Sequence, residues 1–386
     1  MGMIRAALAT LLCAVLCGCV AAPPRNPLPQ ELAGGATIAG IPGARYWADE
    51  PPESFRQWLE LPDEVLEERY SGIIGRHHDY LLISGGGSDG AYGAGLLVGW
   101  TEAGNRPEFQ IVTGISTGAI IAPFAFLGPA YDPTLRELYT SFGSDDLVRR
   151  RGLNELVRGD SAFSTEPMAH LLDHYLGDRE IAAIAAEGRR GRSLLIGTTN
   201  LDAARPVIWD LTRIAMSGAP QAKRLIHDII RASTAIPGAF PPVLFQVESA
   251  GSLYDEMHVD GGVTSQLFLG VTGLDWRRIA VKLRVDGSPQ LHLIRNSQLA
   301  PRWVAVDRRL GPIVSRTISS LIRTQGIGDL AQIYITAEQA GMGFNLARVP
   351  ADFALEPQEL FDRAYMIALF ERGFSAGRDG SAWLNR

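Results

Sequence analysis

The stretch YLLISGGGSDGAYGAG, residues 80–95, places an apolar run directly before a glycine-rich loop. The apolar run predicts a buried strand, and the small residues from Gly90 onward predict a helix. A strand, a glycine loop and a helix leave backbone N–H groups free, and these bind either the phosphates of a cofactor or an oxyanion that forms during a reaction. Gly85, Gly87 and Gly90 also fit the dinucleotide pattern G-x-G-x-x-G. The choice between these two uses depends on the rest of the chain.

Strands and helices alternate along most of the chain. The further strands expected are FQIVTG (109–114), SLLIGTTNL (193–201), PVIWDLT (206–212), MHVDGGV (257–263), RIAVKLRVDG (278–287) and IYITAEQ (333–339). The helices expected are 90–104, 116–128 and 223–234, with helical spacing also at 52–70 and amphipathic spacing at 311–334. This alternation is typical of an α/β fold in which a mainly parallel sheet carries helices on both faces.

A second pattern, TGISTGAI at residues 113–120, contains G-x-S-x-G as Gly114, Ser116 and Gly118. A predicted strand enters it and a predicted helix leaves it, which is the setting of a nucleophile elbow. Ser116 would stand at the N-terminus of a helix, where the helix dipole favours an alkoxide. The alternative is a serine that only caps the helix. With a serine nucleophile, the upstream loop becomes an oxyanion hole in which Gly86, Gly87 and Ser88 donate N–H groups.

A serine nucleophile needs a base, and the sequence offers two kinds. Asp260 precedes Gly261 and Gly262 at the end of a short predicted strand. His292 follows it, so a Ser–Asp–His triad of the α/β-hydrolase type is the alternative to a carboxylate alone. The histidines after the N-terminal segment, none of them in a distinctive motif, are His77, His78, His170, His174, His227, His258 and His292.

The composition excludes several classes of ligand. The formal charge of −6 argues against nucleic acid, which needs a basic face. The dinucleotide interpretation lacks its acidic residue about 20 positions further on, because Glu102 and Glu108 come too early. We therefore expect no cofactor. No histidine pair or carboxylate cluster has ligand spacing, so we expect no metal either.

The N-terminus is typical of an export signal, with a short basic MGMIR and an apolar AALATLLCAVL. A membrane-spanning anchor is the alternative, since the apolar stretch from Ala6 to Ala22 reaches the lower limit of a span. LCGC at residues 16–19 resembles a bacterial lipobox, which implies lipid attachment at Cys19 and, with Val20 after it, sorting to the outer membrane. VAAPPRNPLPQELAGG (20–35) is expected to be an extended tether.

Taken together, these motifs resemble those of the patatin-like phospholipases. That family carries a glycine-rich oxyanion loop, then G-x-S-x-G, then D-G-G or D-G-A, and this chain has GGGSDG, GISTG and DGG in the same order. RASTAIPGAFPPV (231–243) resembles the segment that leads to the family's aspartate. The resemblance implies a three-layer α/β fold and hydrolysis of lipid acyl esters by a Ser116–Asp260 dyad without histidine. The family usually has Arg or Lys where this chain has Asp89, which either favours the first turn of the next helix or changes the preferred head group.

The resemblance also sets the expected domain organisation. Residues 1–18 form the signal peptide, 19–78 the lipidated N-terminus with its tether and helix, 79–275 the catalytic domain and 276–386 a C-terminal α/β extension. The expected partners are a membrane, reached through the lipid anchor, and a phospholipid or lysophospholipid substrate. The alternative from another class is a weakly catalytic lipoprotein that binds lipid or a protein partner.

Overall fold

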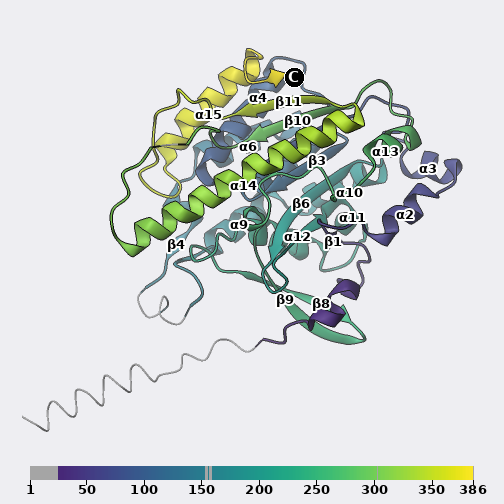
Figure 1. Cartoon of the computed structure of the whole chain (residues 1–386), viewed down its shortest axis with the longest axis horizontal. Coiled ribbons are helices and arrows are strands. Elements are labelled where there is room, and N and C mark those ends of the chain that lie inside the picture. The colour runs from purple at the N-terminus through teal and green to yellow at the C-terminus, as the bar shows by residue number, and fades with distance from the viewer. Residues whose placement is uncertain (1–24, 153–154, 156–158, 302, 386) are drawn as a thin grey trace, which may run out of the picture.

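The computed structural model of the chain describes residues 25–152, 155, 159–301 and 303–385 (Figure 1). The expected signal peptide at residues 1–18 and the expected lipidation site at Cys19 lie outside the described residues. Within the part that is described, no helix is both long enough and apolar enough to cross a membrane.

One sheet runs through the centre of the molecule. From edge to edge its strands are β1 (Arg45–Trp47), β7 (Arg205–Asp210), β6 (Ser193–Asn200), β3 (Ile111–Ile115), β2 (Asp79–Ile83), β10 (Gln290–Arg295), β11 (Gly343–Arg348) and β12 (Leu384–Asn385). The inner strands β6, β3, β2, β10 and β11 are parallel to one another. At the edges, β7 is antiparallel to β6 and to β1, and β12 is antiparallel to β11. A hairpin of β8 (Val243–Ser249) and β9 (Ser252–Asp260) joins the sheet where β9 pairs with the end of β6. The carboxyl ends of the parallel strands therefore meet the end of β9 at one edge.

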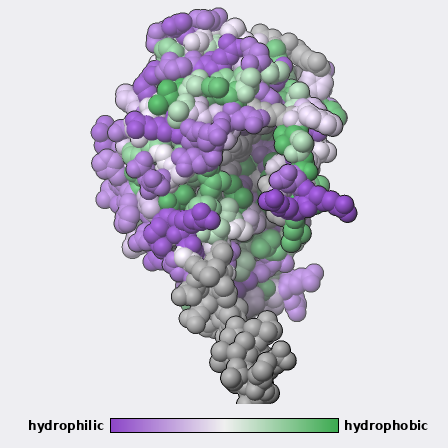
Figure 2. Space-filling view, turned by 90° about the vertical axis from the view of Figure 1, so that its left-hand side faces the viewer, coloured by the Kyte–Doolittle hydropathy of each residue, from purple (hydrophilic) through white to green (hydrophobic). Residues whose placement is uncertain are grey.

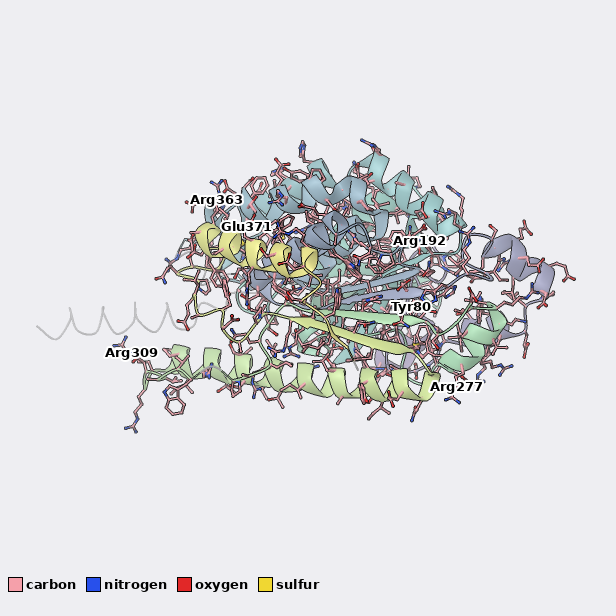
Figure 3. All side chains as sticks on the ribbon, turned by 90° about the horizontal axis from the view of Figure 1, so that it is seen from above. Tyr80, Arg192, Arg277, Arg309, Arg363 and Glu371 are labelled. Carbon is pink, nitrogen blue, oxygen red and sulfur yellow. The ribbon has the colours of Figure 1, made fainter. Side chains whose placement is uncertain are left out.

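Helices cover both faces of this sheet, which makes three layers (Figure 3). One face carries α4 (Gly90–Glu102), α5 (Thr117–Leu127), α6 (Asp132–Thr140), α10 (Asp178–Arg189), α11 (Leu211–Met216), α12 (Ala222–Ser233) and α15 (Arg363–Arg378). The other face carries α13 (Trp276–Lys282) and α14 (Leu310–Ala340). Side chains of β2 alternate between the two cores: Leu81 and Ile83 enter the first, and Tyr80 and Leu82 the second. A strand buried on both faces reads as a continuous apolar run, which explains the pattern in the sequence.

Shorter elements surround this frame. They are η1 (Gln30–Gly35), α2 (Glu53–Leu59), α3 (Asp63–Arg69), η2 (Gly87–Asp89), η3 (Pro129–Tyr131), α7 (Ser144–Leu147), β4 (Arg149–Arg150), β5 (Phe163–Ser164), α9 (Glu166–Tyr175) and η4 (Gly261–Val263). The helical segment expected at 52–70 is divided into α2 and α3 at Pro62, because proline has no N–H to continue a helix.

The α/β class, the mainly parallel inner sheet and the helices on both faces agree with the prediction. Two expected strands are wrong. RIAVKLRVDG begins in α13, since the Asp275 carboxylate accepts the Arg278 N–H at 3.0 Å and caps a helix there. IYITAEQ lies in α14, because Leu330, Ile333 and Ala337 are buried at helical spacing, and this packing outweighs the β-propensity of the isoleucines.

The proposed tether also differs from the prediction over its described part. Arg25 pairs with Asp202 at 2.7 Å and with Asp255 at 2.7 Å, so the segment is attached to the hairpin at that point. From Gln30 it forms a 3-10 helix in place of extended polyproline backbone. After residue 275, β10 pairs with β2, β11 pairs with β10 and β12 pairs with β11, so this part of the chain completes the same sheet.

Candidate active site

Ser116 lies where β3 ends and α5 begins. Its φ is +54° and its ψ is −123°, a strained combination for a residue with a side chain, which costs about 1–3 kcal/mol. The tight turn requires Gly118, because a Cβ there would lie 2.3 Å from the carbonyl oxygen of Ile83 on the neighbouring strand. A Cβ on Gly114 would likewise lie 2.4 Å from the Gly118 carbonyl oxygen. The strand-to-helix turn that the G-x-S-x-G pattern predicts is thus present.

The carboxylate of Asp260 lies beside this serine. The Ser116 hydroxyl donates to Asp260 Oδ2 at 2.7 Å, across 144 residues of sequence. The other carboxylate oxygen, Oδ1, accepts the N–H of Gly262 at 2.7 Å, which is possible because the chain turns sharply after β9. A Cβ on Gly261 would lie 2.5 Å from the Gly197 carbonyl oxygen, so the DGG sequence also lets β9 approach β6 closely. The two residues singled out by sequence are thus in direct contact.

Burial changes the acidity of this carboxyl group. Both side chains are buried, with Ser116 7% and Asp260 6% exposed. Desolvation disfavours the charged carboxylate and raises the pKa of Asp260 from 3.8 to about 6, although the hydrogen bonds from Ser116 and Gly262 act in the opposite direction. A carboxylate with a raised pKa is a stronger base than an exposed one, and it is still ionised at neutral pH.

The glycine-rich loop passes directly over the serine. Gly85 is close enough that a Cβ on it would lie 3.1 Å from the Ser116 Cβ, and Gly90 packs against the Thr117 side chain on α5. Gly87 has φ of +59° and nothing within 4 Å of a Cβ position, and its backbone lines the same cavity as Ser116. Gly86 precedes it, and Ser88 follows within η2, at the start of the turn into α4. The loop is therefore placed where backbone N–H groups can face an oxygen bound next to Ser116.

Asn296, which the sequence reasoning missed, holds this loop in position. Its side-chain NH₂ donates to the Ser84 carbonyl at 2.9 Å, and its side-chain oxygen, Oδ1, accepts the Gly93 N–H at 3.1 Å. Its backbone N–H also donates to the Ser84 hydroxyl at 2.9 Å. Asn296 is fully buried and follows β10, the strand next to β2. A polar residue directly after an apolar strand was the available signal, since carboxyl ends of parallel strands form sites.

A second residue outside the predicted set supports the serine itself. The Ser116 N–H donates to the Ser233 hydroxyl at 3.0 Å, and that hydroxyl donates to the Gly197 carbonyl at 2.7 Å. Ser233 is fully buried and ends α12, within the RASTAIPGAFPPV segment. These bonds satisfy backbone groups that the strained turn would otherwise leave unpaired.

An apolar cavity opens on the serine. It holds about 810 Å³ of empty space, part of which is open to solvent. Its walls come from the elbow, α6, α9 and α15, and from the segment after α12; the lining residues are Gly87, Ser116, Thr117, Ile120, Phe124, Leu138, Tyr139, Leu147, Met168, Leu171, Leu172, Tyr175, Thr234, Ile236, Phe240, Phe361 and Met366. Such a cavity suits an apolar chain whose reactive end lies at Ser116.

The histidine of the alternative triad lies elsewhere. His292 Nε2 bonds to Asp79 Oδ1 at 2.7 Å, near the start of β2. It pairs with Leu81 on β2, so strand spacing of about 4.8 Å and a rise of about 3.3 Å per residue put it about 16 Å from Ser116. His258 lies on the same strand as Asp260, but its ring nitrogens bond to Thr198 Oγ1 at 2.9 Å and Glu256 Oε2 at 3.2 Å. These histidines already have partners of their own.

The side chain of Asp89 does not cap the helix that follows it. It accepts a hydrogen bond from the Tyr365 hydroxyl at 2.5 Å, which ties the oxyanion-loop region to α15. Among the described residues, no group of three or more His, Cys, Asp or Glu side chains is arranged to hold a metal ion.

Comparison with known proteins supports the sequence prediction of the family. The model of the family described as "Patatin-like phospholipase" matches residues 81–271, a range that contains the elbow, the glycine-rich loop and the DGG turn. No match was found among curated proteins. Among solved structures, the chain is similar to VipD from Legionella pneumophila, with 13% identity and a TM-score of 0.33 over 80% of this chain and 68% of that chain.

Proposed function

Because residues 81–271 form a patatin-like phospholipase domain, we propose that the chain is a serine acyl hydrolase that cleaves lipid esters. Ser116 is its nucleophile and Asp260 its general base. The observation that carries this proposal is the 2.7 Å hydrogen bond from the Ser116 hydroxyl to Asp260 Oδ2, beside an apolar cavity that Ser116 lines. A hydroxyl and a base within hydrogen-bond reach, beside backbone donors, are the parts that acyl transfer needs.

The reaction then runs in two steps. In the first, Asp260 takes the proton of the Ser116 hydroxyl while the serine oxygen attacks the ester carbonyl carbon. The carbonyl oxygen becomes an oxyanion, and the N–H groups of the glycine-rich loop stabilise it. The C–O bond to the alcohol breaks, and the alcohol leaves with the proton from Asp260. In the second step a water gives a proton to Asp260 and attacks the acyl carbonyl carbon. The bond between that carbon and the Ser116 oxygen then breaks, Asp260 returns the proton to the serine oxygen, and the fatty acid is released.

The cavity supports a lipid acyl ester as the class of substrate. An acyl chain of a phospholipid or lysophospholipid would lie along the apolar walls formed by residues such as Ile120, Phe124 and Leu172, with its ester at Ser116. Burial of apolar surface contributes roughly 25 cal/mol per Å², so this cavity favours long acyl chains over the acetyl group of a short ester. We further propose that lipidation at Cys19 anchors the chain in the bacterial outer membrane, as the lipobox-like LCGC suggests.

The proposal is tested by product analysis with matched serine variants. Purified full-length chain, incubated with phospholipid vesicles or lysophospholipid micelles, should release free fatty acid detected by mass spectrometry. Ser116→Ala should lower the rate by at least about a thousandfold. Ser217→Ala, at the serine directly after α11, should leave the rate unchanged. Equal rates for wild type and Ser116→Ala would refute the proposal, and absence of release from any acyl ester would favour a lipid-binding protein without turnover.

A further inference from the structure

Helix α14 extends far beyond the sheet that it covers. It has 31 residues, or about 46 Å at 1.5 Å per residue, whereas β11, which follows it, has 6 residues and spans about 20 Å. The chain reverses between them, so α14 runs antiparallel to β11 and its N-terminal end points past the carboxyl edge of the parallel strands. That is the edge at which Ser116 and the glycine-rich loop lie. Figure 3 shows Arg309 at this outer end of α14, and Arg277 beside the other end of the helix.

The apolar side chains of α14 change sides along the helix. In its C-terminal half Leu330, Ile333 and Ala337 are buried against the sheet. In its N-terminal half Leu310 is 80% exposed and Leu321 is 66% exposed. At about 100° per residue these two positions lie on the side of the helix roughly opposite the buried set. Ile313, Val314 and Ile318 complete the exposed stripe, each 46% exposed. The stripe therefore faces away from the protein's own core.

The segment that leads into the helix adds to this surface. Trp303 is 95% exposed, and Val304 and Val306 are exposed beside it in the sequence. We call residues 303–323 the α14 arm. Contiguous apolar surface on a soluble protein marks a site for a partner or a membrane. Figure 2 views the molecule from this side and shows hydrophobic side chains next to strongly hydrophilic ones on the surface.

The charge of this region is opposite to that of the chain as a whole. Residues 300–328 contain five arginines and one acidic residue, Asp307, in a chain of net charge −6. Arg308 and Arg309 are exposed at the tip of the arm, directly before Leu310. Tryptophan, an apolar stripe and arginines together are the composition of segments that lie in the interface of an anionic membrane.

We propose that the α14 arm docks the protein on the surface of an anionic lipid bilayer, with Trp303 and Leu310 inserted and Arg308 and Arg309 on the phosphates. A second copy of the chain fits less well, because a two-fold contact through this stripe would bring the arginines of both copies together. Docking would take place near the candidate active site, because the middle of α14, just beyond the arm, contacts the turn after Asp260. Asp329 accepts the N–H of Gln266, and Arg295 packs at Gly326. The proposal does not depend on turnover at Ser116.

Vesicle flotation tests the proposal on the full-length chain carrying Cys19→Ser and Ser116→Ala, so that neither acylation nor turnover contributes. The chain should float with phosphatidylglycerol-containing vesicles more than with pure phosphatidylcholine. Arg308→Glu with Arg309→Glu should lower the partition coefficient on anionic vesicles by about thirtyfold or more, since each basic residue near the surface contributes about 1 kcal/mol. Arg277→Glu with Arg278→Glu makes the same charge change on α13 and should leave the partition coefficient unchanged. Leu310→Ser should weaken binding by about tenfold or more, whereas Val281→Ser, 77% exposed on α13, should not.

Three outcomes would overturn the proposal. The first is equal flotation of the Arg308/Arg309 variant and its parent, and the second is an equal loss in the α13 control. The third is a dimer in sedimentation without vesicles that Leu310→Ser dissociates, which would identify a second copy as the occupant. In chains with Ser116 intact, hydrolysis of a soluble short-chain ester should be the same for the Arg308/Arg309 variant and wild type, which shows that the fold is intact. Loss of all ester hydrolysis with retained flotation would instead count against the proposed function alone.

Discussion

Replacing Asp260 with asparagine should remove most of the activity and at the same time make the folded protein more stable at neutral pH. The amide keeps the shape of the carboxylate: its oxygen can still accept the Gly262 N–H, and its NH₂ can donate to the Ser116 hydroxyl. It cannot take a proton from the serine, so kcat should fall by on the order of 10²–10⁴.

The gain in stability follows from the raised pKa of Asp260. Burial raises this pKa from 3.8 to about 6, so folding favours the protonated form. The stability that this preference contributes is complete below pH 3.8 and is lost as the pH rises through about 6. Two pKa units correspond to about 3 kcal/mol. The variant carries no charge at this position, so its free energy of unfolding should exceed that of wild type by on the order of 2–3 kcal/mol at about pH 8 and by almost nothing at about pH 4.

Urea unfolding of both proteins across this pH range measures the difference. Asp228→Asn, a partly exposed carboxylate on α12 that pairs with Arg231, is the control and should show no comparable gain with pH. The same carboxyl group predicts that kcat/KM of the wild type rises with pH through about 6, because only ionised Asp260 can act as the base. Two results would refute the assignment of a buried charge at the site. One is an Asp260→Asn variant that is less stable than wild type at about pH 8, and the other is a difference in free energy of unfolding that is the same at about pH 4 and about pH 8.

Three further outcomes are expected. Asn296→Ala removes the amide that holds the Ser84 carbonyl and should lower kcat by about tenfold to a hundredfold, since small displacements of a catalytic loop are costly; unchanged kcat in a folded variant would show that the loop holds its position without this amide. His292→Ala removes a bond to Asp79 and ring contacts with Trp100 and Trp383, all far from the serine, so activity of the folded variant on a soluble ester should stay within about tenfold; a loss as large as that of the aspartate variant would support the Ser–Asp–His triad. Cys19→Ser should release the protein from the bacterial membrane fraction, and a mature wild-type N-terminus without lipid would contradict the anchor.

The parts of the site that sequence predicted are those with strict local requirements. The elbow at Ser116 needs small residues on both sides, because Gly118 meets the backbone of the neighbouring strand, and such requirements leave a pattern in the sequence. The turn after Asp260 is equally local. Asn296 could not be found in this way, because its role depends on β10 lying next to β2, a neighbour more than 200 residues away in sequence.

The errors in secondary structure have a similar origin. RIAVKLRVDG and IYITAEQ are rich in β-branched residues, which favour strands when only local propensity is considered. In the fold, one segment begins with a cap from Asp275 and the other continues a long helix whose buried face is set by contacts with the sheet. A local cap therefore decided the first segment and tertiary packing the second, and short apolar runs reveal neither.

The identity of the nucleophile is the central claim, and covalent labelling tests it most directly. A fluorophosphonate reacts with an activated serine hydroxyl, and peptide mass spectrometry locates the adduct. A single adduct on Ser116 is expected in the wild-type chain, with none in Ser116→Ala and slow formation in Asp260→Asn, where the base is missing. An adduct on a different serine that persists in Ser116→Ala would contradict the account.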